Sequence, residues 1–316
     1  MMRKKSFWLK LLLLLCLVPL VACQGQKSAT KDSKESASTE KTEQADQKTT
    51  EKAEGKVTIA VNGDANRIIW EDVKKRLKAD GVDLDIKSMT GWVSPNVAVK
   101  DDEADLNCFQ YIPFLKDFND SHDADLVPIG YAFLPPISIY AVPEIKSLED
   151  IPDGAKFALP EDPVNLGHSL LEIENAGLIK LKDSEATDIT LDDVVENPKN
   201  LDFILLDGPN IARALGDVDL MITGSTVARD AELSEDQAIY TEDVNKTSNY
   251  YKVTIVAKRD RKDDPLLKKV VEAYNDPATV EAMQKNFDDT VLPAWGDDDH
   301  PVEDYDGLVE KLANEK

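Results

Sequence analysis

Residue types on which many functional sites depend are scarce in this sequence. Three Cys and three His among 316 residues exclude a disulfide scaffold and leave little for a His-rich metal centre. The 37 Lys and Arg are outnumbered by 61 Asp and Glu, so a formal charge of −24 leaves no basic surface with which to attract phosphate. The composition therefore predicts no nucleic-acid partner.

Catalytic signatures are also missing. The sequence has no GxGxxG or GxxxxGK[ST] phosphate loop, no GxSxG nucleophile elbow, no HExxH and no CxxC. The acidic stretch from Asp297 to His300 lacks EF-hand spacing and is interpreted as a solvated turn. Cys108 has no His or Lys close to it in sequence and is predicted to be a small buried residue, not a nucleophile. We therefore expect a binding protein without metal or cofactor, not an enzyme.

Residues 1–22 predict a secretory signal. Basic residues within 1–10 precede an apolar run, residues 11–22, that is twelve residues long, shorter than the roughly 20 that a transmembrane helix needs. The run ends in Leu20-Val21-Ala22-Cys23, which resembles a bacterial lipobox. That resemblance implies cleavage before Cys23 and its acylation, so that lipid anchors the protein on the extracytoplasmic face of the cell membrane. An ordinary cleaved signal with an incidental Cys is the alternative.

Residues 23–56 are interpreted as the lipidated Cys and a disordered tether. From residue 24 on, this segment has no large apolar side chain, and its seven Lys balance seven Asp and Glu. It therefore cannot bury enough surface to offset the entropy of ordering. A flexible chain of this length spans about 30 Å root-mean-square, which lets a folded body stand away from a membrane.

From residue 57 on, apolar runs of strand length alternate with amphipathic stretches, the pattern of an α/β protein with mainly parallel sheets. The first unit is a strand over 57–61, a helix on which Ile69, Val73 and Leu77 share one face, and a strand over 82–88. Further strands are predicted at 125–129, 137–142, 156–159, 201–206, 220–223 and 251–257, and helices at 113–118, 166–176, 211–215 and 266–274. Because the 260 residues of 57–316 exceed what one core usually serves, two lobes are expected.

Several longer phrases occur in order along this body. They are DLNCFQYIPFL from Asp105, SLEDIPDGA from Ser147, LPEDPVNLG from Leu159, AGLIKLKD from Ala176 and VENPKNL from Val195, with RAL at Arg213 and DVD at Asp217. Together with the lipobox and the tether, these phrases resemble the MetQ/NlpA family, the methionine-binding lipoproteins of ABC importers, over about residues 57–295.

The resemblance implies a two-lobed periplasmic-binding-protein fold, type II-like, in which two mainly parallel sheets flanked by helices close on one small ligand by a hinge motion. Lobe one is expected at residues 57–134 and 250–316, and lobe two at residues 135–249. The chain would cross between the lobes near residues 133–136 and 248–251. Pro135 and Pro136 suit a stiff crossing, because proline fixes φ and supplies no amide donor.

The resemblance also implies where the ligand binds. Methionine needs an apolar, polarizable slot for its thioether and a charge-complementary clamp for its carboxylate and ammonium groups. An aromatic wall is expected, in which each sulfur–aromatic contact contributes roughly 0.3 to 1.5 kcal/mol; core packing is the alternative for each ring. The wall comprises Trp92, Phe109, Tyr111 and Phe114, and the remaining expected ligand-binding residues are Asn165, His168, Gly224, Ser225, Tyr251 and Val253.

The clamp departs from the family pattern. Asn165 matches a ligand residue at a helix start, where free amides favour an anion. His168, however, lies where the family often carries an Arg that pairs with the ligand carboxylate, and Gly224 and Val253 lie where some or many relatives carry Asn. A buried charge without its partner costs about 3 to 5 kcal/mol, so, unless another group compensates, free methionine is expected to bind about a hundredfold or more worse than in a typical relative. We interpret His168 as a neutral hydrogen-bond donor; a packed surface histidine unrelated to the ligand is the alternative.

The predicted function is therefore that of a monomeric, lipid-anchored substrate-binding protein. It would deliver methionine, another apolar amino acid or derivative, or a short methionine-containing peptide to an ABC permease and ATPase complex. A diverged adhesion or scaffolding lipoprotein and a cell-surface hydrolase are the alternatives. The acidic tail after Trp295 departs from the usual family end. Its apolar spacing predicts a short amphipathic helix that carries Tyr305, Leu308, Val309 and Leu312, with an unstructured end as the alternative.

Overall fold

The computed structural model describes residues 54–184, 186, 188–245, 249–287 and 290–314. The predicted signal, Cys23 and the predicted tether up to residue 53 lie outside these residues, as does Ser248 at the expected second crossing. Within the described residues, no helix is long and apolar enough to cross a bilayer.

The first sheet begins with the βαβ unit that the hydrophobic pattern predicts. Strands β1 (Gly55–Asn62) and β2 (Val82–Met89) pair in parallel and are connected by helix α1 (Asp64–Ala79). β1 starts at Gly55, inside the range predicted as tether. The face of α1 that covers the sheet buries Ile69, Val73 and Leu77. Gly63 precedes the helix with a φ of +80°, a conformation that costs glycine little because it has no Cβ.

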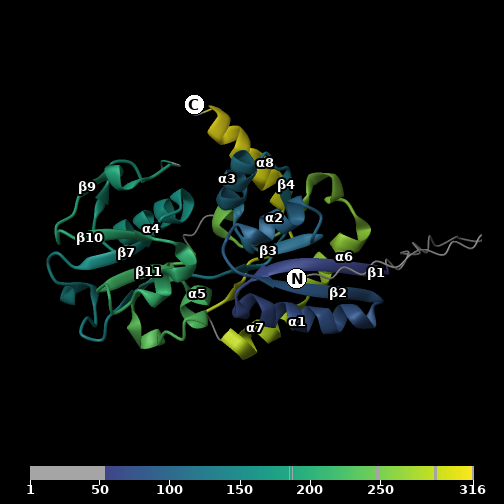
Figure 1. Ribbon diagram of the computed structural model, residues 1–316, viewed down its shortest axis with the longest axis horizontal. Helices are drawn as coiled ribbons and strands as arrows, with labels where there is room; N and C mark the ends of the chain where they lie inside the picture. Colours follow the sequence, from purple (N-terminus) through teal and green to yellow (C-terminus); the bar gives the residue numbers. More distant parts are fainter. Residues whose placement is uncertain (1–53, 185, 187, 246–248, 288–289, 315–316) are drawn as a thin grey trace, which may run out of the picture. The chain divides into compact units, whose positions relative to one another are not determined.

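The first sheet is buried on both faces. Its strand order is β2-β1-β3-β13-β4. Alternate residues of β1 point to opposite faces, so Val57, Ile59 and Val61 join one core while Ala60 joins another. The first core packs against α1, α6 and α7, and the second against α2, α3 and α8 (Figure 1). The bounds are β3 Leu106–Gln110, β4 Leu126–Tyr131, β13 Thr254–Lys258, α2 Ser94–Lys100, α3 Ile112–His122, α6 Pro265–Tyr274, α7 Pro277–Phe287 and α8 Pro301–Asn314.

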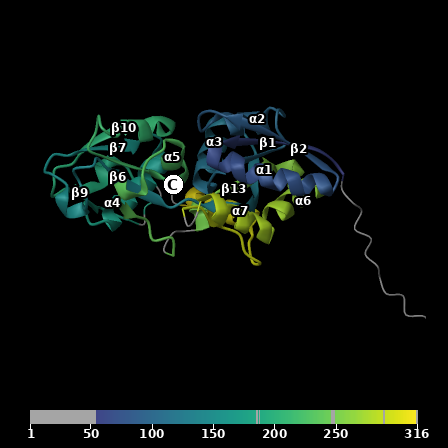
Figure 2. The same cartoon turned by 90° about the horizontal axis from the view of Figure 1, so that it is seen from below.

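The second sheet has the order β10-β7-β11-β6-β12 and its own two cores. Helix α4 covers one face with Leu166, Leu170 and Ile173, while the 3-10 helix η3 and helix α5 cover the other. Figures 1 and 2 show this sheet and its helices as a group separate from the first sheet. The bounds are β6 Ile137–Ala141, β7 Lys156–Pro160, β10 Asp202–Leu206, β11 Leu220–Gly224, β12 Ala238–Thr241, α4 Pro163–Asn175, α5 Ser225–Asp230 and η3 Gly208–Arg213.

Short elements connect these layers. β5 pairs antiparallel with β14, and β8 pairs antiparallel with β9. The strands are β5 Phe133–Leu134, β8 Lys180–Leu181, β9 Val194–Glu196 and β14 Leu292–Pro293. The remaining 3-10 helices are η1 Leu148–Asp150, η2 Leu191–Asp193, η4 Glu235–Gln237, η5 Asn249–Tyr251 and η6 Arg259–Arg261.

Both sheets are mixed, although parallel pairs were expected to dominate. β6 runs antiparallel to β11 and β12, and β13 runs antiparallel to β3 and β4. Each of these strands is the first to enter its sheet after the chain has crossed from the other one. An entering strand starts at the side of its sheet that faces the other sheet, so it must run away from the other sheet. The parallel strands run toward the other sheet and end at the same side, so the two directions are opposite. The antiparallel strands thus follow from the two crossings.

The predicted elements are present, with two differences. The helix expected at 211–215 is the 3-10 helix η3, which Pro209 opens and which ends at Arg213, because Gly216 follows with a φ of +109°. The strand expected from 251 starts only at Thr254, because η5 occupies the preceding segment. Between them, Val253 pairs with the other crossing segment: its amide donates to the Phe133 carbonyl at 2.8 Å, and its carbonyl accepts from the Ala132 amide at 2.8 Å.

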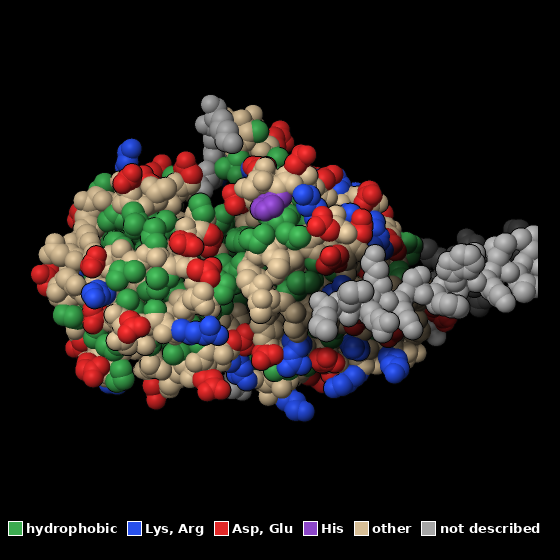
Figure 3. All heavy atoms as spheres, viewed as in Figure 1, with side chains coloured by type: hydrophobic (Ala, Val, Ile, Leu, Met, Phe, Trp, Pro, Cys, Tyr) green, Lys and Arg blue, Asp and Glu red, His purple; other side chains and the backbone are tan. Residues whose placement is uncertain are grey.

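Charged side chains are distributed unevenly over one face of the molecule. Figure 3 shows Asp and Glu across the whole visible face, whereas most of the visible Lys and Arg gather over the half that contains α1. One of the basic residues of α1, Arg76, pairs with Asp72 of the same helix at 3.1 Å. It also donates to the Thr279 hydroxyl at 2.5 Å, a hydrogen bond that joins α1 to α7.

The acidic tail forms helix α8, as its apolar spacing predicts. Tyr305 and Leu308 are buried against the core under α3, and the Asn119 side-chain amide donates to the Tyr305 hydroxyl at 2.7 Å. Arg259 joins the helix to β4 through Asp306 at 2.9 Å and Asp125 at 2.7 Å. α8 is therefore an integral layer of the first lobe.

Replacing Leu308 with Ala should lower the free energy of unfolding by about 2 to 4 kcal/mol, because the buried side chain leaves a cavity. Leu205→Ala is the matched control: this leucine is 40% exposed, so its loss should change stability by less than about 0.5 kcal/mol. Urea denaturation of the two variants measures both values. Equal effects would show that α8 does not contribute to the cooperative fold.

Candidate ligand-binding site

A cavity of about 150 Å3 lies where strand ends of the two sheets meet. It receives Asn62 from the end of β1, Gln110 from the end of β3, Pro160 from the end of β7 and Gly224 from the end of β11. Ile137 at the start of β6 also lines it. Ligands bind preferentially at the carboxyl ends of strands in α/β sheets, because loops and helix starts converge there.

Four aromatic rings from the first lobe form one wall. Trp92 precedes α2, Phe109 is in β3, Tyr111 lies between β3 and α3, and Phe114 is in the first turn of α3. The Phe114 ring packs edge-to-face against Trp92 at 6.5 Å and against Phe109 at 6.0 Å between centroids. Such pairs hold one another in place and leave ring faces for a ligand. The structure thus brings together all four members of the expected wall.

A buried amide network supports this wall. The Asn96 amide donates to Gln110 Oε1 at 2.7 Å, and the Asn107 amide donates to Asn96 Oδ1 at 2.8 Å. All three side chains are buried, and Gln110 reaches the cavity. The sequence signal for this network was the presence of Asn107 and Gln110 in an otherwise apolar strand, and sequence reasoning missed it.

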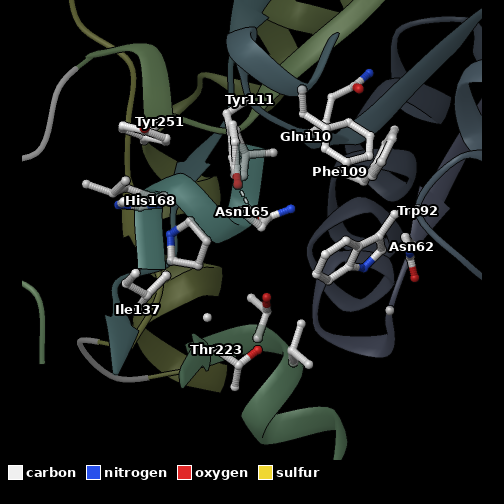
Figure 4. A pocket seen from close by; sticks show the side chains of 18 of the residues that line it. Asn62, Trp92, Phe109, Gln110, Tyr111, Ile137, Asn165, His168, Thr223 and Tyr251 are labelled. Carbon is white, nitrogen blue, oxygen red and sulfur yellow. Dashed lines mark hydrogen bonds between the residues drawn. The ribbon is translucent and has the colours of Figure 1, made fainter. Parts of the chain in front are cut away.

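Helix α4 of the second lobe provides the opposite wall. Its N-cap, Asp162, accepts from the backbone amide of Asn165 at 2.9 Å and from its side-chain amide at 2.9 Å. Burial raises the pKa of Asp162. The Tyr111 hydroxyl donates to Asn165 Oδ1, so this hydrogen bond joins the two lobes across the cavity (Figure 4). The Asn165 backbone amide is therefore not free, since Asp162 already occupies the position of an anion at this helix start.

His168 lies one turn further along α4 and is buried, which excludes the alternative of a surface histidine. Its ring stacks on Tyr251 with centroids 3.8 Å apart and an interplanar angle of 17°. Its Nε2 lies 3.3 Å from Glu242 Oε1. Tyr251 follows the second crossing in η5, so the stack ties α4 to the segment that connects the lobes.

The remaining expected residues are of two kinds, those that line the cavity and one that does not. Gly224 and Val253 line the cavity, whereas Ser225 does not appear among its lining residues. The Ser225 hydroxyl instead donates to the Thr290 carbonyl at 2.5 Å, a contact between α5 and the first lobe.

Asp230 is a cavity residue that sequence reasoning did not find. From the end of α5 its carboxylate accepts from the amides of Asp64 at 3.0 Å and Ala65 at 3.2 Å, and so caps α1 of the other lobe. The α1 N-terminus has no side-chain cap of its own. A Cβ on Gly63 would lie 2.5 Å from the Asp230 carboxylate, so this approach requires glycine there. No sequence signal indicates a cap that comes from 165 residues away.

Two further contacts join the lobes beside the cavity. The Arg229 guanidinium lies over the Phe287 ring, 4.7 Å from its centroid. The Trp92 ring packs against the backbone at Gly208 so closely that a Cβ there has no room. Together with Tyr111 and Asp230, these contacts hold the described conformation of the two lobes.

Charge in the cavity wall is mainly negative. Among the described lining residues, Asp230 and Glu242 carry carboxylates, His168 is the one histidine, and neither Lys nor Arg occurs. Glu242 was also not expected at the site. It follows β12, where its Oε2 accepts from the Ile137 amide at 3.0 Å.

Residues 57–295 match the NlpA lipoprotein family. This chain belongs to that family. It is 38% identical over 218 residues to the D-methionine-binding lipoprotein MetQ of Yersinia pestis. The matched residues make up 68% of this chain and 79% of the relative. A solved ABC transporter periplasmic substrate-binding protein from Coxiella burnetii superposes with a TM-score of 0.70 at 33% identity, over 75% of this chain and 99% of that one. A nutrient-binding protein from Burkholderia cenocepacia, solved bound to methionine, superposes with a TM-score of 0.71 at 31% identity, over 76% of this chain and 100% of that one.

Membership of the NlpA lipoprotein family confirms the resemblance on which the site prediction was based. The two-lobed α/β fold of periplasmic substrate-binding proteins is confirmed as well. NlpA lipoproteins are substrate-binding proteins of ABC transporters and not enzymes, in agreement with the missing catalytic motifs.

Burial keeps the cavity phenols neutral. It raises the pKa of Tyr251 from 10.0 to about 12, with Glu242 and Glu172 adding to the effect. It also raises the pKa of Tyr111, where Asp162 contributes next. Both hydroxyls therefore remain hydrogen-bond donors at any physiological pH.

The raised pKa of Tyr251 predicts a loss of stability in alkali. Between about pH 10 and 12 the unfolded chain releases a proton that the folded protein keeps, so the free energy of unfolding falls as pH rises, by at most about 1.4 kcal/mol per pH unit for one tyrosine. Urea denaturation at about pH 9, 10 and 11 measures the slope. Tyr251→Phe should make it shallower; an unchanged slope would contradict the buried, neutral Tyr251.

Proposed function

We propose that this protein is the lipid-anchored substrate-binding component of an ABC importer. In this proposal it captures methionine, or a related amino acid or short peptide, between its lobes and delivers it to the permease and ATPase complex. The observation that carries the proposal is one cavity, with aromatic rings of the first lobe on one side and polar groups of α4 on the other.

The aromatic wall suits a thioether side chain. The rings of Trp92, Phe109 and Phe114 are apolar and polarizable, and each sulfur–aromatic contact would contribute roughly 0.3 to 1.5 kcal/mol. On the opposite wall, the side chain of Asn165 would orient a polar headgroup. The relatives named for methionine support this ligand class.

The headgroup environment argues for a relative of methionine over methionine itself. A free amino acid carries a carboxylate, and the described cavity residues offer no Lys or Arg to pair with it. Asp230 and Glu242 would instead attract an ammonium group. The carboxylates of Asp230 and Glu242 would also repel the carboxylate of a free amino acid. In a peptide, the carboxylate of methionine is an amide or lies farther from the amino group, so this repulsion is weaker.

Opening and closing would take place at the two crossings. The paired backbone segments at Ala132, Phe133 and Val253 form a narrow connection between the lobes. We propose lobe one as residues 57–134 and 250–316 and lobe two as residues 135–249, with the hinge between them. Ligand entry then requires breaking the contacts that Tyr111 and Asp230 make across the cavity.

A lipid on Cys23 would keep the protein at the membrane that holds the permease. Support comes from the lipobox-like sequence before Cys23 and from relatives that are named lipoproteins. The segment up to residue 56 would act as the tether.

Replacing Phe109 with Ala should weaken ligand binding by about 2 to 4 kcal/mol, because it opens the wall against which the apolar end rests. Native mass spectrometry of the purified protein first identifies the bound ligand, and calorimetry then measures its affinity. Phe203→Ala, which removes a ring outside the cavity, is the matched control and should leave affinity unchanged. Equal affinity of wild type and Phe109→Ala would mean that the ligand binds elsewhere.

His168→Arg should improve the binding of free methionine by about tenfold or more, that is, by at least about 1.4 kcal/mol, since a guanidinium restores a partner for the carboxylate. Calorimetry with methionine and with a methionine dipeptide amide separates the two ligand classes. The amide, which lacks the carboxylate, should not gain. No gain for methionine would mean that other residues hold its headgroup.

A further inference from the structure

Three residues of metal-ligand type lie together at the wall that α4 contributes. His168, Glu172 and Glu242 each place one nitrogen or oxygen within 4.8 Å of those of the other two. All three are buried, with exposed fractions of 6%, 8% and 6%. Imidazole nitrogen and carboxylate oxygen are both common metal ligands in proteins.

Local structure explains how they meet. His168 and Glu172 are four residues apart on α4, so they project from the same face of the helix. Glu242 comes from the segment directly after β12, the edge strand of the second sheet. The cluster therefore forms only when α4 packs on this sheet.

Among the described residues, no Lys or Arg pairs with Glu172. Its Oε1 accepts from the Asn175 amide at 2.9 Å and its Oε2 from the Tyr240 hydroxyl at 2.8 Å, and both donors are neutral. Among the ion pairs of the described residues, Glu172 takes part in none. A second carboxylate, Glu242, lies beside it, and like charges at this distance repel in a buried site.

The same hydrogen bonds orient the carboxylates. Tyr240 fixes Glu172, and the Ile137 amide fixes Glu242 at 3.0 Å. Stacking on Tyr251 fixes the plane of the His168 ring, and its Nε2 points to Glu242 Oε1 at 3.3 Å. Metal sites depend on such outer partners, whose loss typically costs 10- to 100-fold in affinity.

We propose that His168, Glu172 and Glu242 bind one divalent transition metal ion of the class of Zn2+. One imidazole and two carboxylates match its donor preference, and a three-residue set leaves a position open. An organic cation in the cavity contacts Glu242 but not Glu172, which does not line it, whereas a small ion between the three reaches all of them. If the proposed function holds, the ion supplies positive charge at the wall where the family resemblance implies an arginine.

Zinc uptake by the full-length protein tests the site. The protein is purified in detergent through a tag without histidine, stripped with a chelator and dialysed. Wild type should bind one equivalent of Zn2+ by calorimetry and elemental analysis. His168→Gln and Glu172→Gln should each weaken binding more than about 100-fold. Tyr240→Phe should weaken it about 10-fold, because it removes one of the two hydrogen-bond donors that orient Glu172 and no metal ligand.

Two histidine variants outside the cluster serve as controls. His300→Gln removes the histidine of the acidic turn, and His122→Gln removes the ring that stacks on Phe118. Both should bind Zn2+ like wild type, and circular dichroism confirms that every variant is folded. Stoichiometric binding that survives His168→Gln and Glu172→Gln, or no stoichiometric uptake by wild type, would overturn the proposal.

The metal site and the proposed transport function are separable. Ligand affinity is measured by calorimetry on the stripped and on the zinc-loaded protein. Ligand binding without zinc uptake would contradict the metal site and support the proposed function. Zinc uptake without binding of methionine, related amino acids or short peptides would support the metal site and contradict the proposed function.

Discussion

The two crossings of the chain between its sheets are the constraint on which the rest of the structure depends. Because the chain leaves each sheet at the edge facing the other, parallel strands end there and the entering strands β6 and β13 start there. Helix starts and loop residues from both lobes are thereby brought to one cavity. The aromatic wall, the cap of α1 and the His168 stack all follow from this arrangement.

Contacts between the lobes use groups that a ligand could also use. The Tyr111 hydroxyl binds Asn165, and Asp230 binds the first turn of α1; within the second lobe, Asp162 binds the first turn of its own helix α4. Helix N-termini attract anions, so a carboxylate ligand competes with carboxylates that the protein already provides. This competition, together with the negative cavity wall, supports the proposal of a ligand whose headgroup is less anionic than that of a free amino acid.

Sequence patterns predicted the layers of the fold better than its details. The spacing of Ile69, Val73 and Leu77 predicted α1, and the apolar residues of the tail predicted α8, because a helix or strand that buries one face shows it as a period. The directions of β6 and β13 were not predicted, since no local pattern differs between parallel and antiparallel pairing in a strand buried on both faces. Within the site, the family resemblance led to Trp92, Phe109, Tyr111, Phe114, Asn165, His168, Gly224, Tyr251 and Val253, all of which line one cavity. Their part in binding a ligand stays a prediction.

The sequence by itself determined the class of protein: few Cys and His, an acidic body, a lipobox-like signal and an ordered set of family phrases. Only the tertiary structure decided the chemistry of the cavity side that faces the aromatic wall. Asp230 reaches α1 across 165 residues, and Glu242 joins His168 and Glu172 across 74 and 70 positions. Such electrostatic partners are set by distances in space, and in a chain with 61 acidic residues no local pattern marks the few that meet.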